Sequence, residues 1–470
     1  MRHAMTLMSV TDSVFLAVET REHPMHVGGL ELFTPPADAG PDYPRDLRAA
    51  LLRHTDARPV FRRHPANPVS TRGYVAWAED TELELDYHFR HSALPGPGRV
   101  RELLEVTSRW HSTPLDRHRP LWEIHLVEGL QDGRFAMYSK IHHALMDGVS
   151  ALRQLRGVLS TDPDARDCPP PWGSPPSAEG RTGSPRRGFL HGLPVPDPRR
   201  LVRTGRATVG QLAGLAPMAT RVATEAWREH RLTLPLRAPK TMLNVPIGGA
   251  RRFAAESWER TRIAHVAHAA RVSSNDIVLA MCSGALRTYL TEHGALPDEP
   301  LVAMVPVSLR GRTEAGATSG NRIGAILCDL GTHLADPTAR LSRVARSMAD
   351  GKRLFSDLTP IQALVLSAFN VAPLAATPLP GFVEHTRPPF NIVISNVPGP
   401  RERLYFNGAR LDGIYPASVL LDGQALNITF TNGPTTLDCG ITGCRRSVPH
   451  LQRLLGHLEQ SLADLECAVA

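Results

Sequence analysis

Apolar and polar positions along the chain predict strands and helices in both halves. Residues 135–141 form an apolar, β-prone run, and apolar residues at 149–159 recur with helical spacing. Further along, the runs 302–307 and 390–395 indicate buried strands, and 277–289 indicates a helix preceded by polar capping residues. The pattern predicts an α/β architecture.

A proline-rich stretch separates the two halves. Prolines crowd together with Ser, Gly and Arg between positions 162 and 200, which is a linker composition. We expect an N-terminal subdomain at 1–161, a linker with a crossover helix at 162–235, and a C-terminal subdomain at 236–470. Residues 201–234 mix arginines with apolar positions, so this helix either lies on a membrane surface or packs across the seam between the subdomains.

Composition narrows the class of protein. The chain has 470 residues, 42% of them hydrophobic, which is enough for a large core. It has no run of about eighteen apolar residues and no signal-peptide pattern, so we expect a cytoplasmic protein. Its six cysteines are scattered, which favours neither a disulfide framework nor a zinc site. Gly248-Gly249-Ala250 lacks the spacing of a phosphate-binding loop, so no bound ATP or NAD is expected.

The net charge of +7 suggests anionic partners. Almost all basic residues are arginines, and no basic run is interleaved with aromatic residues, so we expect no nucleic-acid partner. The phosphates of a coenzyme or an anionic membrane surface fit this charge better.

Two adjacent histidines, His142 and His143, are followed by Asp147 and Gly148 at a predicted strand-to-helix corner. Neighbouring side chains at a strand end point to opposite faces, so these histidines are poorly placed to share a metal ion. One is expected to face a cavity and the other to brace the corner. A neutral imidazole can take the proton of an attacking hydroxyl, which suits acyl transfer. The alternative is a pair of buried structural histidines, with Asp147 as a helix N-cap.

Several blocks of the chain, in order, resemble the bacterial wax ester synthase/diacylglycerol acyltransferase family. This family is part of a wider superfamily with chloramphenicol acetyltransferases and peptide-synthetase condensation domains. The blocks outside the double-histidine motif name the family: Pro24-Met25-His26-Val27-Gly28-Gly29, Leu85-Asp86-Tyr87-His88-Phe89-Arg90, Leu115-Asp116-Arg117, Pro120-Leu121-Trp122-Glu123, Leu243-Asn244, Asn275-Asp276-Ile277-Val278-Leu279-Ala280, Pro306-Val307-Ser308-Leu309-Arg310, Gly320-Asn321 and Ser395-Asn396-Val397-Pro398-Gly399-Pro400.

The resemblance implies two acetyltransferase-like subdomains, each a mixed sheet flanked by helices, with an active-site tunnel at their interface. His143 would be the general base that activates the hydroxyl of diacylglycerol or a fatty alcohol for attack on acyl-CoA. His142 would be structural. Asp147 would orient the corner through a salt bridge, for which Arg310 is the candidate partner. No bound cofactor or metal is implied, since acyl-CoA is a co-substrate.

Asn275 and Asp276 have two interpretations. Their side chains suit N-capping of the helix that follows, whereas the family pattern places Asn275 beside the substrate or the tetrahedral oxyanion. Asn396 is a further candidate pocket residue, and Trp122 is expected to pack in the core. The uncharged segment 362–383, interrupted by prolines, is expected in the core, with an acyl-chain pocket or membrane-facing lip as the alternative.

Three functions are compatible with the sequence. The first is an acyl-CoA-dependent O-acyltransferase that makes triacylglycerol or wax esters, attached peripherally to a membrane or lipid droplet because its acceptors are insoluble in water. The second is a condensation-type enzyme acting on carrier-protein-bound acyl groups. The third is a lipid-binding protein without catalysis. The intact motif argues against the third, and the blocks outside the motif argue against the second.

Overall fold

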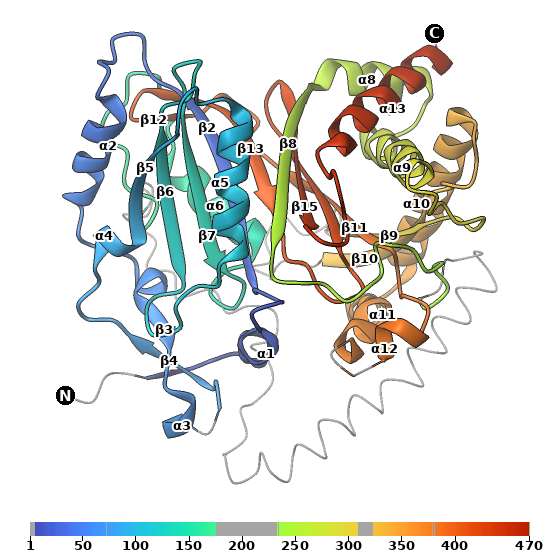
Figure 1. The fold of residues 1–470 in the computed structure, drawn as a ribbon, viewed down its shortest axis with the longest axis horizontal. Coiled ribbons are helices and arrows are strands. Elements are labelled where there is room, and N and C mark those ends of the chain that lie inside the picture. The colour runs from blue at the N-terminus through green and yellow to red at the C-terminus, as the bar shows by residue number, and fades with distance from the viewer. Residues whose placement is uncertain are drawn as a thin grey trace.

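Two six-stranded sheets form the centres of two lobes (Figure 1). The computed structural model describes residues 5–71, 73–174, 233, 235–308, 323–377, 379 and 381–469. The N-terminal sheet has the strand order β12 (Tyr405–Phe406), β13 (Ala409–Ala417), β2 (His26–Thr34), β7 (Phe135–His142), β6 (Trp122–Glu128) and β5 (Phe89–Ala93). The C-terminal sheet has the order β10 (Ile323–Asp329), β9 (Val302–Ser308), β11 (Ile392–Pro398), β14 (Leu426–Asn432), β15 (Thr436–Cys444) and β8 (Arg251–Glu259).

Helices flank both sheets, and a small sheet lies at one end of the N-terminal lobe. This small sheet has the order β1 (Thr6–Leu7), β4 (Ala76–Glu79) and β3 (Arg63–Pro65). The helices of the N-terminal lobe are α1 (Val10–Val18), α2 (Tyr43–Leu52), α3 (Pro68–Thr71), α4 (Leu85–His88), α5 (Val100–Ser112) and α6 (Gly148–Val158), with a 3-10 turn at Pro59–Arg62. Those of the C-terminal lobe are α8 (Arg260–Ala269), α9 (Ser274–Glu292), α10 (Pro337–Asp357), α11 (Pro360–Val371), α12 (Phe382–His385) and α13 (Arg453–Val469), with a 3-10 turn at Ala372–Ala376. The predicted α/β class is confirmed.

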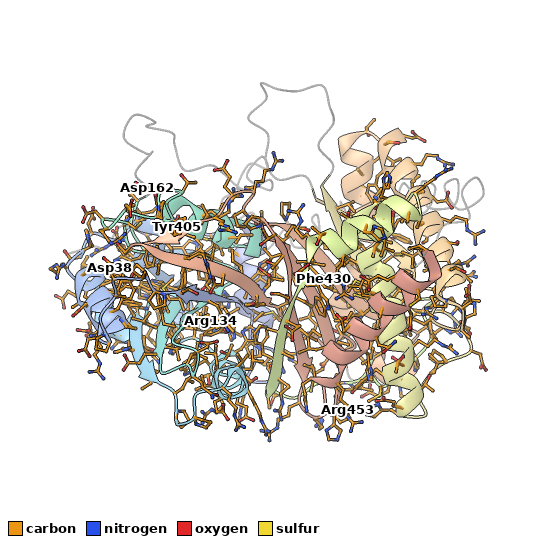
Figure 2. The ribbon with its side chains drawn as sticks, turned by 90° about the horizontal axis from the view of Figure 1, so that it is seen from above. Asp38, Arg134, Asp162, Tyr405, Phe430 and Arg453 are labelled. Carbon is orange, nitrogen blue, oxygen red and sulfur yellow. The ribbon has the colours of Figure 1, made fainter. Side chains whose placement is uncertain are left out.

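Helix α9 is the central helix of the C-terminal core. Its residues from Asp276 to Leu286 are all buried, between the sheet and helices α10 and α13 (Figure 2). A helix that is apolar on nearly all sides is stable only when surrounded by other elements. The predicted helix at 277–289 is confirmed as part of α9, and the predicted strand at 302–307 is confirmed as β9. The strand predicted at 390–395 begins two residues later, at Ile392.

The C-terminal half of the sequence contributes two strands to the N-terminal sheet. Strand β13 belongs to the C-terminal half of the sequence but pairs antiparallel with β2, with Pro416 opposite Gly29. Trp172, in the stretch predicted as linker, is buried and lies 5.9 Å, centroid to centroid, from the ring of Trp122. The sheets thus do not follow the predicted boundaries at 161 and 236, because β12 and β13 complete the N-terminal sheet. The predicted crossover helix at 201–234 lies outside the described residues except Thr233.

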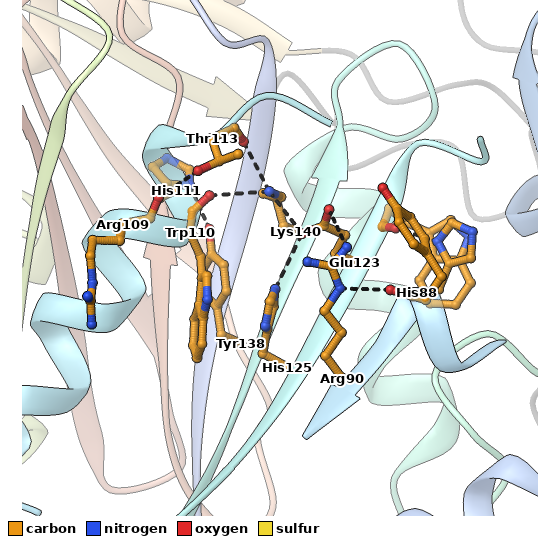
Figure 3. A network of polar contacts seen from close by, with 12 residues as sticks. His88, Arg90, Arg109, Trp110, His111, Thr113, Glu123, His125, Tyr138 and Lys140 are labelled. Carbon is orange, nitrogen blue, oxygen red and sulfur yellow. Dashed lines mark hydrogen bonds and ion pairs between the residues drawn. The ribbon is translucent and has the colours of Figure 1, made fainter. Parts of the chain in front are cut away.

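A buried ionic network braces the face of the N-terminal sheet that α5 covers (Figure 3). The Lys140 ammonium is 1% exposed, lies 3.1 Å from Glu123 Oε2, and donates to the carbonyl oxygens of Trp110 and Thr113. Arg90 and His125 also contact the Glu123 carboxylate, each at 3.2–3.3 Å. Burial would raise the pKa of Glu123, but His125, Lys140 and Arg90 outweigh it and lower the pKa to about 2. The carboxylate is therefore ionised and fully partnered.

Candidate active site

A cavity of about 580 Å³ opens between the N-terminal sheet, helix α6 and the C-terminal lobe. Strands β2, β6 and β7 supply one wall, and α6 supplies the facing wall with Val149, Ala151, Leu152 and Leu155. Strand β13 extends the wall formed by the N-terminal sheet, and strands β9, β11 and β14 of the C-terminal sheet close the cavity from the other side. The lining is mostly apolar, but polar side chains also border it, among them Gln154, Asn427 and Thr429. A largely apolar cavity with a few polar groups is typical of a small-molecule site. Its place between the lobes is where the sequence predicted a tunnel.

His143 lies at the edge of this cavity, one residue beyond the end of β7. Its backbone N–H donates to the Met25 carbonyl oxygen at 2.7 Å, which ties the corner to the start of β2. Its ring stacks on Phe15 of α1, with 4.2 Å between the ring centroids. The prediction that one histidine faces a cavity is confirmed.

Burial lowers the pKa of His143, and the negative charge of Asp147 partly opposes this. The imidazole is therefore neutral near pH 7, which is the form that accepts a proton.

His142 is fully buried and faces away from the cavity. The Ala144 N–H donates to its Nδ1 at 3.1 Å, so the ring proton resides on Nε2, which lies 3.3 Å from Glu19 Oε1. Glu19 also binds Arg117 at 2.9 Å and accepts from the Met25 N–H. These contacts hold the strand-to-helix corner on the side away from the cavity. Glu19 was not predicted, because no sequence signal links it to residues about a hundred positions away.

Asp147 is the N-cap of α6, and its carboxylate accepts from the Ser150 N–H at 2.7 Å. Gly148 is the first residue of the helix, and both residues line the cavity. The capping alternative for Asp147 is thus confirmed. Arg310, the predicted partner of Asp147, lies outside the described residues, so that salt bridge stays a prediction.

Replacing Asp147 with alanine is expected to lower the free energy of unfolding by about 0.5–2 kcal/mol, because the N-cap bond is lost. Asn caps about as well as Asp, so Asp147→Asn should keep most of that stability. Both variants remove the charge that raises the pKa of His143, so the acid limb of the rate profile should move to lower pH. Urea unfolding and pH–rate profiles measure the two effects. An unmoved acid limb would show that Asp147 does not act on His143 electrostatically.

Asn275, Asp276 and Asn396 gather at one end of the C-terminal sheet. Ser273, not Asn275 or Asp276, is the N-cap of α9, and Asp276 completes the capping box at its third position. Asn396 Nδ2 donates to Asn275 Oδ1 at 3.3 Å, and Asn432 Nδ2 donates to Asn396 Oδ1 at 2.5 Å. The sequence thus singled out two residues that do meet, but missed Asn432.

These three predicted substrate-binding residues are not among the residues lining the described cavity. Alternation along β11 explains this for Asn396, since its neighbours Ser395 and Val397 face the cavity. Their contact with substrate stays a prediction.

Two further expectations have structural outcomes. Trp122 is fully buried and its Nε1–H donates to the Phe61 carbonyl oxygen, so it packs in the core as predicted, although its ring also lines the cavity. In the segment 362–383, Ala363, Val365 and Leu366 are buried in helix α11, which packs on β10. Core packing is therefore the observed role of these residues.

Comparison with known proteins decides the family. The model of the wax ester synthase/diacylglycerol acyltransferase catalytic domain matches residues 8–278, and that of the family's C-terminal domain matches residues 319–466. The chain belongs to the wax ester synthase/diacylglycerol acyltransferase family. A Mycobacterium tuberculosis protein named as a diacylglycerol O-acyltransferase is 54% identical to this chain. The match covers 99% of this chain and 100% of the relative.

Solved structures agree with this membership. A wax ester synthase/diacylglycerol acyltransferase from Marinobacter aquaeolei VT8 matches with a TM-score of 0.78 and 39% identity over 99% of both chains. The first condensation domain of the CDA synthetase matches with a TM-score of 0.56 at 16% identity, over 100% of this chain and 97% of that one, which shows a shared fold alone. The predicted pair of chloramphenicol-acetyltransferase-like lobes is confirmed for this family member.

Proposed function

We propose that His143 is the general base of an acyl-CoA-dependent O-acyltransferase that makes triacylglycerol from diacylglycerol, wax esters from long-chain alcohols, or both. As a member of this family the chain is an acyltransferase. The observation that carries the residue assignment is the neutral imidazole of His143 at the edge of an apolar, lipid-sized cavity. The relatives' names favour diacylglycerol as the acceptor.

The reaction then needs one proton carrier. His143 removes the proton from the acceptor hydroxyl as its oxygen attacks the carbonyl carbon of the thioester. The tetrahedral intermediate collapses, the carbon–sulfur bond breaks, and the imidazolium returns the proton to the CoA thiolate. The products are an ester and free CoA. No nucleophilic serine or cysteine is required, because the acyl group passes directly from sulfur to oxygen.

His142 and Asp147 support this chemistry by holding the backbone on either side of His143. The Glu19–His142 contact and the Asp147 cap fix the two ends of the corner that carries His143. Phe15 packs against the face of the His143 ring and limits its rotation. Such packing keeps the base in the orientation required for proton transfer.

Transfer of a labelled acyl group from CoA tests the function directly. Purified protein is incubated with labelled palmitoyl-CoA and a panel of diacylglycerol, hexadecanol and a carrier-protein-linked amine. Labelled triacylglycerol or wax ester supports the proposal. Transfer to the carrier-linked amine alone would instead support a condensation-type enzyme, and no transfer to any acceptor would contradict an acyltransferase.

We further propose that the protein meets its acceptors at a membrane or lipid-droplet surface. Within the described part of the chain, no helix is long and apolar enough to cross a membrane. Elements α1, β1, α3 and β4 lie at the lower edge of the N-terminal lobe in Figure 1. They carry, or directly follow, six exposed apolar residues: Met5, Leu7, Val14, Val18, Val69 and Val75. Helix α1 also carries Phe15, which touches His143, so this edge lies next to the catalytic corner.

Changing Met5, Leu7 and Val69 together to serine is expected to reduce vesicle binding about tenfold, since burying apolar area drives insertion. Flotation with phosphatidylcholine vesicles, with and without anionic lipid, measures the effect. Val100→Ser is the matched control, because Val100 is exposed on α5, away from this edge.

A variant with Arg203, Arg206, Arg228 and Arg231 changed to Gln tests the basic segment separately. Vesicle binding through these arginines should weaken as the salt concentration rises, whereas binding through the apolar side chains should not. Unchanged flotation of the triple serine variant would contradict the apolar edge as the contact.

A further inference from the structure

Glu31 is a buried acid inside the catalytic cavity. It lies on β2 opposite Met137 of β7, is 3% exposed, and is one of the lining residues. It shares its face of β2 with Val27 and Gly29, and the wall around it is apolar, including Ile124 and Leu155. Burying a carboxyl group here would be unfavourable if the cavity held only hydrocarbon.

The carboxyl group lies back over Gly29, on the side toward the catalytic corner. A Cβ atom at Gly29 would fall 2.6 Å from Glu31 Oε1, so the missing side chain makes room for the acid. Ser139 is the register partner of Gly29, and its hydroxyl donates to Glu31 Oε2 at 3.5 Å. Oε1, Oε2 and the Ser139 hydroxyl therefore form a small polar spot on the cavity wall.

This acid differs sharply from Glu123 in the same sheet. Glu123 is held by Lys140, Arg90 and His125, whereas no described residue forms an ion pair with Glu31. Burial raises the pKa of Glu31 well above its usual range and outweighs the opposing bonds from Ser139 and from the Glu31 backbone N–H. The neutral acid has an O–H to donate and a C=O to accept. Leaving such a group without a good partner in an apolar site is unfavourable.

We propose that Glu31 and Ser139 form a subsite for a hydroxyl group carried on the aliphatic chain of a substrate. Ser139 precedes His143 by four residues, so the subsite is about 13 Å from the catalytic corner at the rise of a strand. The recognised oxygen is therefore on the middle of a chain and not at the reacting end. Resting on the proposed acyl transfer, the subsite makes the enzyme favour mid-chain hydroxylated substrates over unsubstituted ones of equal length.

The hydroxyl could belong to the acyl donor or to the acceptor, and two arms separate these sources. The first arm compares 10- and 12-hydroxyoctadecanoyl-CoA with octadecanoyl-CoA, using one plain acceptor. The second compares 10-hydroxyoctadecanol with octadecanol as acceptors, counts only the ester formed at the first carbon, and uses one plain acyl-CoA. In the arm that holds the true source, the wild-type kcat/KM should be higher for the hydroxylated chain.

Glu31→Met and Glu31→Gln form a matched pair of similar side-chain size. Methionine removes the hydrogen bond, and the preference for the hydroxylated chain should fall about tenfold or more, because a site that bonds a hydroxyl discriminates strongly on that group. Glutamine keeps a donor and an acceptor and should retain most of the preference. Equal ratios in the wild type and Glu31→Met would overturn the proposal.

Equilibrium binding separates this inference from the proposed function. The dissociation constants of 10-hydroxyoctadecanoate and octadecanoate are measured for the wild type and both variants, without any turnover. A preference that Glu31→Met abolishes supports the subsite even where no acyl transfer occurs. If Glu31→Met does not fold, the wild type still decides, since equal affinity for the two fatty acids and equal kcat/KM in both arms would contradict the subsite.

Discussion

His143→Ala is expected to reduce acyl transfer by a factor of about 10² to 10⁴, because the reaction loses its general base. The ring borders a cavity and contacts Phe15, and the bond that ties the corner to Met25 comes from the backbone of residue 143. The melting temperature should therefore change little. Initial rates with labelled acyl-CoA and thermal unfolding of the same preparation measure the two quantities.

His142→Ala is the matched control for this loss. His142 is fully buried against Glu19, so its removal should lower stability and expression, unlike removal of His143. A folded His143→Ala protein that turns over at the wild-type rate would refute the assignment of the base. Equal destabilisation by both substitutions would show that His143 also has a structural role.

Glu123→Ala is expected to destabilise the protein by about 3–5 kcal/mol, since it leaves the Lys140 ammonium buried without its carboxylate. Arg90 and His125 lose the same partner, as the contacts in Figure 3 show. Urea unfolding at pH 7 measures the change. A loss below about 1 kcal/mol, the usual range of a surface ion pair, would contradict a buried network.

The double variant Glu123→Leu/Lys140→Met tests whether the cost arises from the unpaired charge. Replacing a whole buried ion pair with apolar residues is often close to neutral, so this variant should recover much of the lost stability. The pH dependence gives a second check. The folded-state pKa of Glu123 is lowered from 4.5 to about 2, so its contribution is present above pH 4.5 and lost as the pH falls towards 2. In the double variant this acid-dependent loss should be smaller.

Local signals in the sequence determined the corner of the active site. An apolar run, two histidines and a capping aspartate lie within about fifteen residues, and the alternation of side chains along a strand placed His142 and His143 on opposite faces. The same kind of signal predicted helix α9 and strand β9. These features depend on backbone geometry between near neighbours, so a single sequence carries them.

The tertiary structure alone decided which distant segments complete the site. Glu19 meets Arg117 across 98 positions, and β13 joins β2 from the far end of the chain. Strand register, and which helix covers each face of a sheet, decide which side chains face the cavity. They place Glu31 inside it and turn Asn396 away from it. A one-residue shift in register reverses every side chain of a strand, and several pairings keep the same apolar pattern. The sequence pattern therefore determines the elements and their exposed faces, while packing between distant segments determines what those faces enclose.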